Sequence, residues 1–247
     1  MTTRIDRVVS SGVLADDGGA ADAGATGSAG RADSAGRADS AGRADSAGLA
    51  TRKVEANTWI VGDDDEVIVI DPGNDAQPVL AAVGDREVLA VICTHGHADH
   101  IAAALEVAEP DEAPVALHPA ERLEWRDVHA SRDPEIEMED GGSFEVADAR
   151  LEVMHTPGNS RGAVCIYCED LGAVFTGDTL LKGRPGPYGN HYPDFSRQLT
   201  SIGENLLTLP GDTRVLPAHG EESTNAAEEK RFDSWVTAGA EALASAD

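Results

Sequence analysis

Cysteine, lysine and aromatic residues are scarce in this chain of 247 residues, and long apolar runs are missing. Three cysteines, Cys93, Cys165 and Cys168, are too few for a disulfide scaffold. No apolar run approaches the ~20 residues that cross a bilayer. Residues 1–11 contain no apolar stretch of the kind found in a signal peptide. These absences exclude a disulfide-rich secreted protein and a membrane-spanning one, and they predict a cytoplasmic location.

Positive charge is scarce as well. Lys and Arg number 19 against 45 Asp and Glu, which gives a formal net charge of −26. A nucleic-acid-binding surface needs basic side chains to replace counterions, and attraction to anionic lipid needs them too. We therefore expect a small-molecule substrate as the partner, and neither nucleic acid nor a membrane.

A low-complexity segment divides the chain. Residues 16–51 consist almost entirely of Ala, Gly, Asp, Ser and Arg, and the hexad Gly-Arg-Ala-Asp-Ser-Ala starts at Gly30, Gly36 and Gly42. Such a composition offers little apolar area to offset the entropy of ordering, so it predicts a disordered insertion. On this interpretation residues 1–15 hold the first strand of a domain, and residues 52–247 form the remainder of the same domain.

Apolar patterning outside the insertion predicts an α/β protein with more than one sheet. Strands are expected at 5–14, 58–62, 66–70, 88–93, 114–118, 142–147, 149–155, 163–168, 173–176 and 214–216. Helices are expected at 76–83, 98–108, 119–129, 194–208 and 224–244. Paired strands come first, then strands alternate with helices, and the pattern repeats. This order favours a layered single domain.

The segment Thr94–His100 carries the densest chemical signal of the chain. It follows a buried strand and precedes a helix. His95 and His97 are two residues apart and can point to the same side of an extended turn. Asp99 and His100 fall in the first helical turn and point elsewhere. The segment can thus offer two nitrogens to one metal ion, and an oxygen and a nitrogen to a second.

Two further segments place a metal-ligand type of side chain at the end of a predicted strand. Gly177-Asp178-Thr179 supplies a carboxylate, and Ala218-His219-Gly220 supplies an imidazole. Each alone is a weak signal, because an Asp at a strand end is commonly a turn residue. Their value lies in their combination with the histidine segment, because the three segments together resemble one family of proteins.

With Asp71-Pro72-Gly73 and His155-Thr156-Pro157-Gly158 added, these motifs resemble the metallo-β-lactamase-fold hydrolases. The branch that they resemble is the one near the hydroxyacylglutathione (glyoxalase II-like) hydrolases, and the match spans nearly the whole chain outside residues 16–51. The resemblance implies an α/β fold of four αββα layers in a single domain, with the metal site at a sheet edge. It further implies that His95 and His97 bind one metal, that Asp99, His100 and His219 bind a second, and that Asp178 bridges them.

Asn159 departs from the family pattern, in which the Thr-Pro-Gly motif usually continues with a histidine that ligates the first metal. An asparagine carbonyl is a weak ligand for Zn²⁺ beside imidazole. Three interpretations stay open: two metals with a weakened first site, one metal in the second site, or a degenerate enzyme.

The resemblance implies a metal-dependent hydrolase that cleaves a small thioester or ester through a metal-bound hydroxide. One or two Zn ions are the expected cofactor, with Fe or Mn as alternatives, and Asp99 is the expected catalytic residue that orients the hydroxide and takes its proton. Only 28 residues follow His219 (247 − 219), so the helical domain that holds glutathione in related enzymes is not expected. A mononuclear-iron persulfide dioxygenase and a non-catalytic member are the alternatives.

Two weaker signals complete the analysis. Cys165-x-x-Cys168 has the spacing of a redox pair, but residues three apart on a strand face opposite sides, so we expect two buried strand residues. His191 and Tyr192 follow the Asp178 loop and are candidates to line a cleft, although a solvated loop is the favoured interpretation of both.

Overall fold

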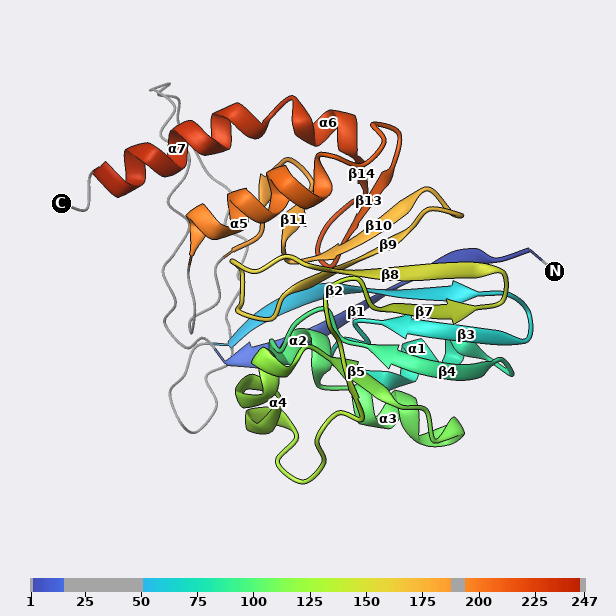
Figure 1. The fold of residues 1–247 in the computed structure, drawn as a ribbon. Coiled ribbons are helices and arrows are strands. Elements are labelled where there is room, and N and C mark those ends of the chain that lie inside the picture. Colours follow the sequence, from blue (N-terminus) through green and yellow to red (C-terminus); the bar gives the residue numbers. More distant parts are fainter. Residues whose placement is uncertain (1, 16–50, 188–193, 245–247) are drawn as a thin grey trace, which may run out of the picture.

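The computed structural model describes residues 2–15, 51–187 and 194–244 (Figure 1). The predicted disordered insertion lies outside the described residues except for Thr51, which begins a strand. Strands β1 and β2 flank this segment and pair antiparallel along their whole length, from Arg4 with Gly62 to Ala15 with Thr51. Ala15 and Thr51, the described residues on either side of this segment, are therefore neighbours on paired strands.

Two six-stranded sheets form the centre of the molecule. The first has the order β1-β2-β3-β4-β5-β6 and the second the order β14-β13-β10-β9-β8-β7. The first sheet consists of β1 (Arg4–Ala15), β2 (Thr51–Gly62), β3 (Glu66–Ile70), β4 (Glu87–Ile92), β5 (Val115–Leu117) and β6 (Ile136–Glu137). The second consists of β7 (Ser143–Val146), β8 (Ala149–His155), β9 (Val164–Cys168), β10 (Ala173–Gly177), β13 (Arg214–Pro217) and β14 (Ser223–Thr224). A separate small hairpin joins β11 (Leu180–Leu181) to β12 (Arg184–Pro185).

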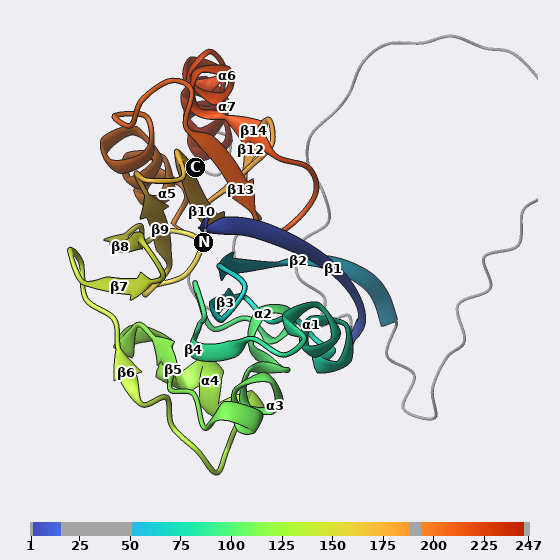
Figure 2. The ribbon, with the colours of Figure 1, turned by 90° about the vertical axis from the view of Figure 1, so that its right-hand side faces the viewer.

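Helices cover the outer face of each sheet (Figure 2). Below the first sheet lie α1 (Ala76–Val83), α2 (Ala98–Ile101), α3 (Ala104–Ala108) with the 3₁₀ turn η1 (Glu109–Asp111), and the 3₁₀ turn η2 (Pro119–Glu121) followed by α4 (Arg122–Val128). Against the second sheet lie α5 (Phe195–Ser201), the π-helical stretch η3 (Ile202–Leu206), α6 (Asn225–Glu229) and α7 (Phe232–Ala244). None of the described helices is long and apolar enough to cross a bilayer.

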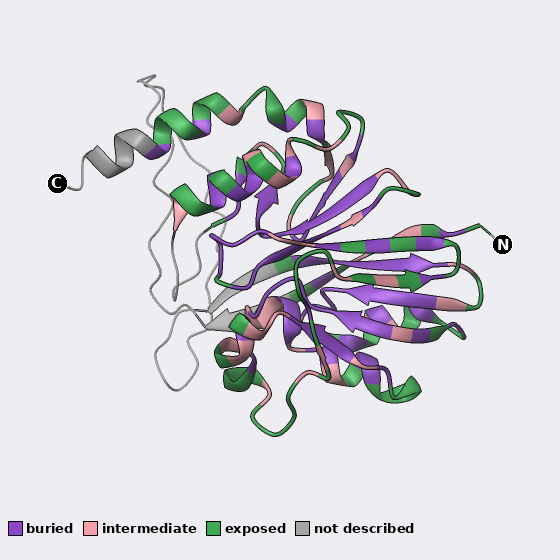
Figure 3. Ribbon diagram, viewed as in Figure 1, coloured by how far each residue is buried: buried purple, intermediate pink, exposed green. Residues whose placement is uncertain are grey.

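Three apolar clusters hold the layers together. One lies between the sheets, where Trp59 of β2 meets Phe175 of β10 with ring centroids 6.0 Å apart. A second packs β3 and β4 against α1 and α3, and a third packs β10 against α5, η3 and α7. The strands are accordingly buried over most of their length, whereas the outer helix faces are exposed (Figure 3). The predicted four-layer αββα sandwich is confirmed.

The helix expected at residues 98–108 is interrupted, which corrects the sequence prediction. The N–H of Ala103 donates to the carbonyl of Gly73 at 2.9 Å, and the N–H of Gly73 donates to the carbonyl of His100 at 3.1 Å. Because of these two hydrogen bonds with Gly73, the backbone between α2 and α3 is not helical. The helices expected at 194–208 and 224–244 are likewise divided, into α5 with η3 and into α6 with α7. The break after α2 ties His100 to the loop that carries Asp71.

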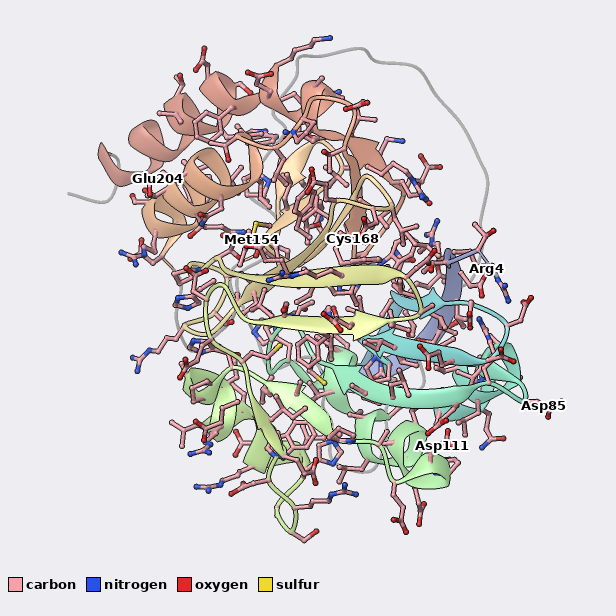
Figure 4. All side chains as sticks on the ribbon, turned by 45° about the vertical axis from the view of Figure 1, so that its right-hand side comes forward. Arg4, Asp85, Asp111, Met154, Cys168 and Glu204 are labelled. Carbon is pink, nitrogen blue, oxygen red and sulfur yellow. The ribbon has the colours of Figure 1, made fainter. Side chains whose placement is uncertain are left out.

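The cysteines are buried strand residues, as their spacing predicts. Cys168 lies in the cluster between the sheets, and Cys165 lies on the opposite face of β9, in the cluster under the helices. Figure 4 shows Cys168 within the sheet, in contrast to Asp85 and Asp111, which project from the rim of the molecule. Burial raises the pKa of the Cys165 thiol to about 11. The pair cannot form a disulfide across the strand.

Candidate metal centre

The candidate ligands come from loops of both sheets that meet at one edge of the sandwich. His95 and His97 follow β4 of the first sheet, and Asp178 and His219 follow β10 and β13 of the second. β10 and β13 are parallel neighbours, so the residues after them emerge at the same edge. Short strand-end loops thus bring together side chains that lie more than 120 residues apart in the sequence (219 − 95 = 124).

Two groups of potential metal ligands face each other at this edge. His95, His97 and Asp178 form the first group, and Asp99, His100 and His219 form the second. In the first group Nε2 of His95 lies 2.8 Å from Nδ1 of His97 and 3.8 Å from a carboxylate oxygen of Asp178. Both nitrogens therefore converge on one point beside that carboxylate, as the sequence spacing predicts.

Asp178 stands between the two groups. Its Oδ2 is 3.8 Å from Nε2 of His95 and 3.8 Å from Nε2 of His100, while its Oδ1 is 3.5 Å from Nε2 of His219. Asp99 closes the second group, with Oδ2 3.4 Å from Nε2 of His219 and Oδ1 3.9 Å from Nε2 of His100. The carboxylate of Asp178 is thus placed where it can contact an ion in either group.

Hydrogen bonds on the far sides of the rings orient the imidazoles. Nδ1 of His100 donates to Oδ2 of Asp71 at 3.2 Å, and Nδ1 of His219 donates to the carbonyl of Glu55 at 2.7 Å. Nδ1 of His95 lies 3.1 Å from Oγ1 of Thr94, which donates to Asp71 at 2.7 Å. With Nδ1 occupied in this way, Nε2 of each ring faces the site as a metal ligand would.

The ionisation of the site reflects its burial and its mixed charges. Burial lowers the pKa of His95, and the positive charges of the neighbouring imidazoles lower it further. Burial also works against a charged His100, but the carboxylates of Asp99, Asp71 and Asp178 raise its pKa to about 10. Burial would raise the pKa of Asp99, yet His100 and His219 hold it well below its usual range. In the metal-free site the carboxylate of Asp99 is therefore ionised at neutral pH, beside a protonated His100 and a neutral His95.

Two buried polar atoms of the site lack hydrogen-bond partners among the described residues. They are Nε2 of His100 and Oδ1 of Asp178, both with almost no solvent contact. Burying a polar atom without a partner is costly, and a divalent cation would satisfy both atoms. Imidazole nitrogens and carboxylate oxygens are also the ligands that Zn²⁺ and Fe²⁺ prefer. The residues present therefore fit a metal ion.

One side of the centre opens to solvent. His95, His100 and Asp178 are buried, whereas His97, Asp99 and His219 are partly exposed. The side chain of Asp99 is 13% exposed and that of His219 is 20% exposed. A small molecule arriving from solvent would meet these two residues first.

Asn159 is fully buried in the loop that follows β8. Its amide nitrogen donates to the carbonyl of Pro187, and its Oδ1 has no hydrogen-bond partner among the described residues. The amide is thus fixed by the neighbouring loop with its oxygen left free. His155, the other histidine of this motif, stacks on His118 with ring centroids 4.4 Å apart and belongs to neither ligand group.

Sequence reasoning missed several residues that support the centre. Asp71 was noted as part of a motif only, yet it contacts Thr94 and His100. Asn57 donates to the carbonyls of Pro217 and Gly220, on either side of His219. No local pattern marks Asn57, because its partners lie about 160 residues away. His191 and Tyr192, predicted as cleft candidates, lie outside the described residues.

Comparisons with known proteins identify the family. Residues 51–219 match the model of the metallo-β-lactamase superfamily. A probable metallo-hydrolase of Bacillus subtilis, YqgX, is 33% identical over 185 residues, covering 69% of this chain and 87% of YqgX. The hydroxyacylglutathione hydrolase of Roseobacter denitrificans is 30% identical over 155 residues, covering 62% of this chain and 57% of that enzyme.

Solved structures agree with these relatives. The BLEG-1 B3 metallo-β-lactamase superposes with a TM-score of 0.65 at 28% identity, over 72% of this chain and 92% of its own. TTHA1623, solved in a di-iron-bound form, superposes with a TM-score of 0.63 at 29% identity, over 72% of this chain and 94% of its own. On the family model, the relatives and the fold together, the chain belongs to the metallo-β-lactamase superfamily.

Proposed function

We propose that this protein is a metal-dependent hydrolase of a small thioester or ester, with one or two Zn ions as cofactor. The single observation that carries the proposal is the position of Asp178. Its carboxylate lies within 3.8 Å of Nε2 of His95, His100 and His219, so it joins both ligand groups into one centre. We extend the proposal to a cytoplasmic location, with a small molecule as the partner and no role for nucleic acid or membrane.

The residues of the centre suit a hydrolytic reaction. A bound metal ion would acidify a coordinated water and polarise the carbonyl of a substrate. Asp99, ionised and partly exposed, lies at the open side, where its free oxygen can orient a water and accept its proton. Burial of His95, His100 and Asp178 keeps bulk water from screening the charges behind the reacting atoms.

The proposed substrate class is supported by the relatives rather than by the fold. The hydroxyacylglutathione hydrolase of Roseobacter denitrificans acts on a glutathione thioester by its name, which supports a thioester. The BLEG-1 structure is described as a β-lactamase, so a β-lactam belongs in the same panel as a comparison substrate. A panel of thioesters, esters, lactones and β-lactams would rank these classes by kcat/KM.

The test combines metal analysis with turnover. We expect purified protein, grown with Zn, Fe or Mn, to hold at least one ion per chain and to cleave a thioester. His219→Ala removes a ligand of the second group and should abolish turnover. Asp85→Asn changes an exposed residue before β4, at the opposite end of that strand from His95, and should not. Protein that retains no metal after supplementation, or full activity in His219→Ala, would overturn the proposal.

A second candidate function is oxidation of a thiol persulfide by O₂ at a single iron ion. The similarity to TTHA1623, solved with two iron ions, favours iron as a metal for this centre without favouring a single ion. Iron-loaded protein would then take up O₂ in the presence of a persulfide and would be inactive on thioesters. A non-catalytic member, the third possibility, would bind metal and show neither reaction.

A further inference from the structure

We infer that Glu121 is a positioning residue, which holds the loop of His95 and His97 against the loop of Asn159 and so sets the metal affinity of the first ligand group. The inference rests on the proposed function, because it assumes that a metal ion binds there. The hydrogen bonds of Glu121 go to backbone N–H groups and not to candidate ligand atoms.

Glu121 joins two loops through one carboxylate. Oε2 accepts the N–H of Gly96 at 2.8 Å, and Oε1 accepts the N–H of Gly162. Gly96 lies between His95 and His97, and Gly162 lies three residues after Asn159. The two loops come from different sheets, since one follows β4 and the other joins β8 to β9. A single side chain thus fixes the distance between the first ligand group and the position where the family has its third nitrogen.

Close packing at both glycines shows how tightly the carboxylate is enclosed. A Cβ atom on Gly96 would lie 2.8 Å from Cβ of Glu124 and 3.0 Å from Oε2 of Glu121. A Cβ atom on Gly162 would lie 2.6 Å from Nδ1 of His118 and 2.9 Å from Cγ of Glu121. Each loop can approach Glu121 this closely only because it has no side chain at the contact.

The carboxylate of Glu121 is buried, and two backbone N–H groups are its hydrogen-bond partners. The residue is 1% exposed. Each N–H group satisfies one of its oxygens. Separation of the two loops would leave a buried carboxylate oxygen without a partner, which is costly. The carboxylate therefore opposes movement of either loop away from the other.

The second ligand group is held by other residues. Asp71 contacts His100, and Asn57 holds the carbonyls that flank His219. Neither residue forms a hydrogen bond to Glu121. Loss of the Glu121 contacts should thus weaken the first group and leave the second group largely intact, and this difference distinguishes positioning from a general structural role.

The experiment is a calorimetric titration of metal-stripped protein with Zn²⁺. His97→Ala, which removes a ligand of the first group alone, identifies the binding event that belongs to that group. In Glu121→Gln the amide oxygen can still accept the N–H of one loop. The amide NH₂ group then faces the N–H of the other loop, and two donors cannot form a hydrogen bond. We expect the His97-dependent affinity to fall about 10–100-fold, the range for loss of a group that orients metal ligands. The affinity of the other binding event should stay within about threefold of the wild-type value.

Glu124→Gln is the matched control, since it makes the same chemical change three residues away, on a carboxylate without a hydrogen bond to either loop. Its two affinities should equal those of the wild type. Glu121→Asp keeps the charge on a shorter stem, so we expect a smaller loss of the same event, and it replaces Glu121→Gln if that variant does not fold.

The outcomes separate the two proposals. Wild-type protein that binds no Zn²⁺ would overturn the proposed function together with this inference. Binding without a His97-dependent event, or an unchanged His97-dependent affinity in the Glu121 variants, would overturn the inference alone. An equal loss of both events would assign Glu121 a structural role and would also overturn it.

Discussion

Asp71 and His100 form a buried pair, with Oδ2 of Asp71 3.2 Å from Nδ1 of His100. The same carboxylate accepts the backbone N–H of Thr94 at 2.8 Å and its hydroxyl at 2.7 Å. Asp71 therefore holds the start of the histidine segment and the ring of His100 at once. The hydrogen bonds between Gly73 and the end of α2 reinforce this link along the backbone.

Replacing Asp71 by asparagine should weaken the fold and the metal site together. Hydrogen bonds to a buried charged group contribute about 1.5–3 kcal/mol each. Asp71→Asn removes only part of this contribution, because the amide keeps one acceptor oxygen for the N–H of Thr94 and can donate to the Thr94 hydroxyl. We expect the free energy of unfolding of metal-free protein to fall by about 2–3 kcal/mol in urea denaturation, and the affinity of the second ligand group to fall about 10–100-fold. Unchanged values for both would contradict the role given to Asp71.

Metal affinity of the second ligand group should rise with pH. In metal-free protein His100 has a pKa of about 10, because the carboxylates of Asp99, Asp71 and Asp178 outweigh its burial. A metal must displace the proton from Nε2, so His100 alone should make the affinity increase about tenfold per pH unit below pH 10. The slope should be steeper where His219, whose pKa is also raised, still holds its proton. His95, whose pKa is lowered, releases no such proton. Chelator competition at pH 6.5, 7.5 and 8.5 measures how the metal affinity changes with pH. An affinity that does not depend on pH would contradict the prediction.

The same raised pKa gives a signed prediction for stability. His100 is protonated more readily in the folded metal-free protein than in the unfolded chain, where its pKa is near 6.5. Its contribution to stability is then complete below about pH 6.5 and is lost as pH rises toward 10. The dependence should become shallower in His100→Gln, where His219, whose pKa is also raised, remains. Thermal unfolding between pH 6.5 and 9 provides the measurement.

Much of the candidate site could be predicted because its ligands lie in short local motifs. Four of the ligands, His95, His97, Asp99 and His100, lie within six residues at a strand end. Their spacing alone indicates that two of the side chains point to one ion and two to another. Asp178 and His219 needed the family resemblance, since each is an isolated residue after a strand. The alternating strand pattern likewise predicted the layers, because burial imposes a period that the sequence must follow.

The contacts that support the site could not be predicted, because they depend on tertiary packing. Glu121 meets Gly96 and Gly162 across separations of 25 and 41 residues. Asn57 meets Gly220 across 163 residues. The interrupted helix after His100 has the same origin, since the bond from Ala103 to Gly73 arises from packing and no helix-breaking residue marks it. Secondary-structure propensity predicts single helices and strands, and it contains no information on which loops contact each other in the folded chain.

Deletion of residues 19–47 should leave the fold intact. Ala15 and Thr51 are paired, so the six residues that remain between them, 16–18 and 48–50, can close the hairpin. The deleted residues are almost all Ala, Gly, Ser, Asp and Arg, and the shorter loop costs about 1.5 kcal/mol less to close. We expect Tm to stay the same or rise by up to about 5 °C. A loss of cooperative unfolding would show that the segment contributes to the packed domain.

Asn159→His should restore the nitrogen that the family places after Thr-Pro-Gly. Asn159 is buried, and its amide is held by the carbonyl of Pro187, so the new ring must break that hydrogen bond to reach the first ligand group. If two ions act and the first is weakly held, the variant should bind the first ion at least tenfold more tightly. It should also cleave a thioester faster when metal is limiting, because a second cation stabilises the developing oxyanion. If one ion in the second group suffices, the rate should stay flat or fall.

Titration of Zn²⁺ into the wild type, Asn159→His and Asn159→Gln, with turnover followed at each step, separates these cases. Asn159→Gln is the control, because it changes the side-chain volume without adding an imidazole. A gain in affinity by Asn159→Gln equal to that of Asn159→His would show that the ring nitrogen is not the cause.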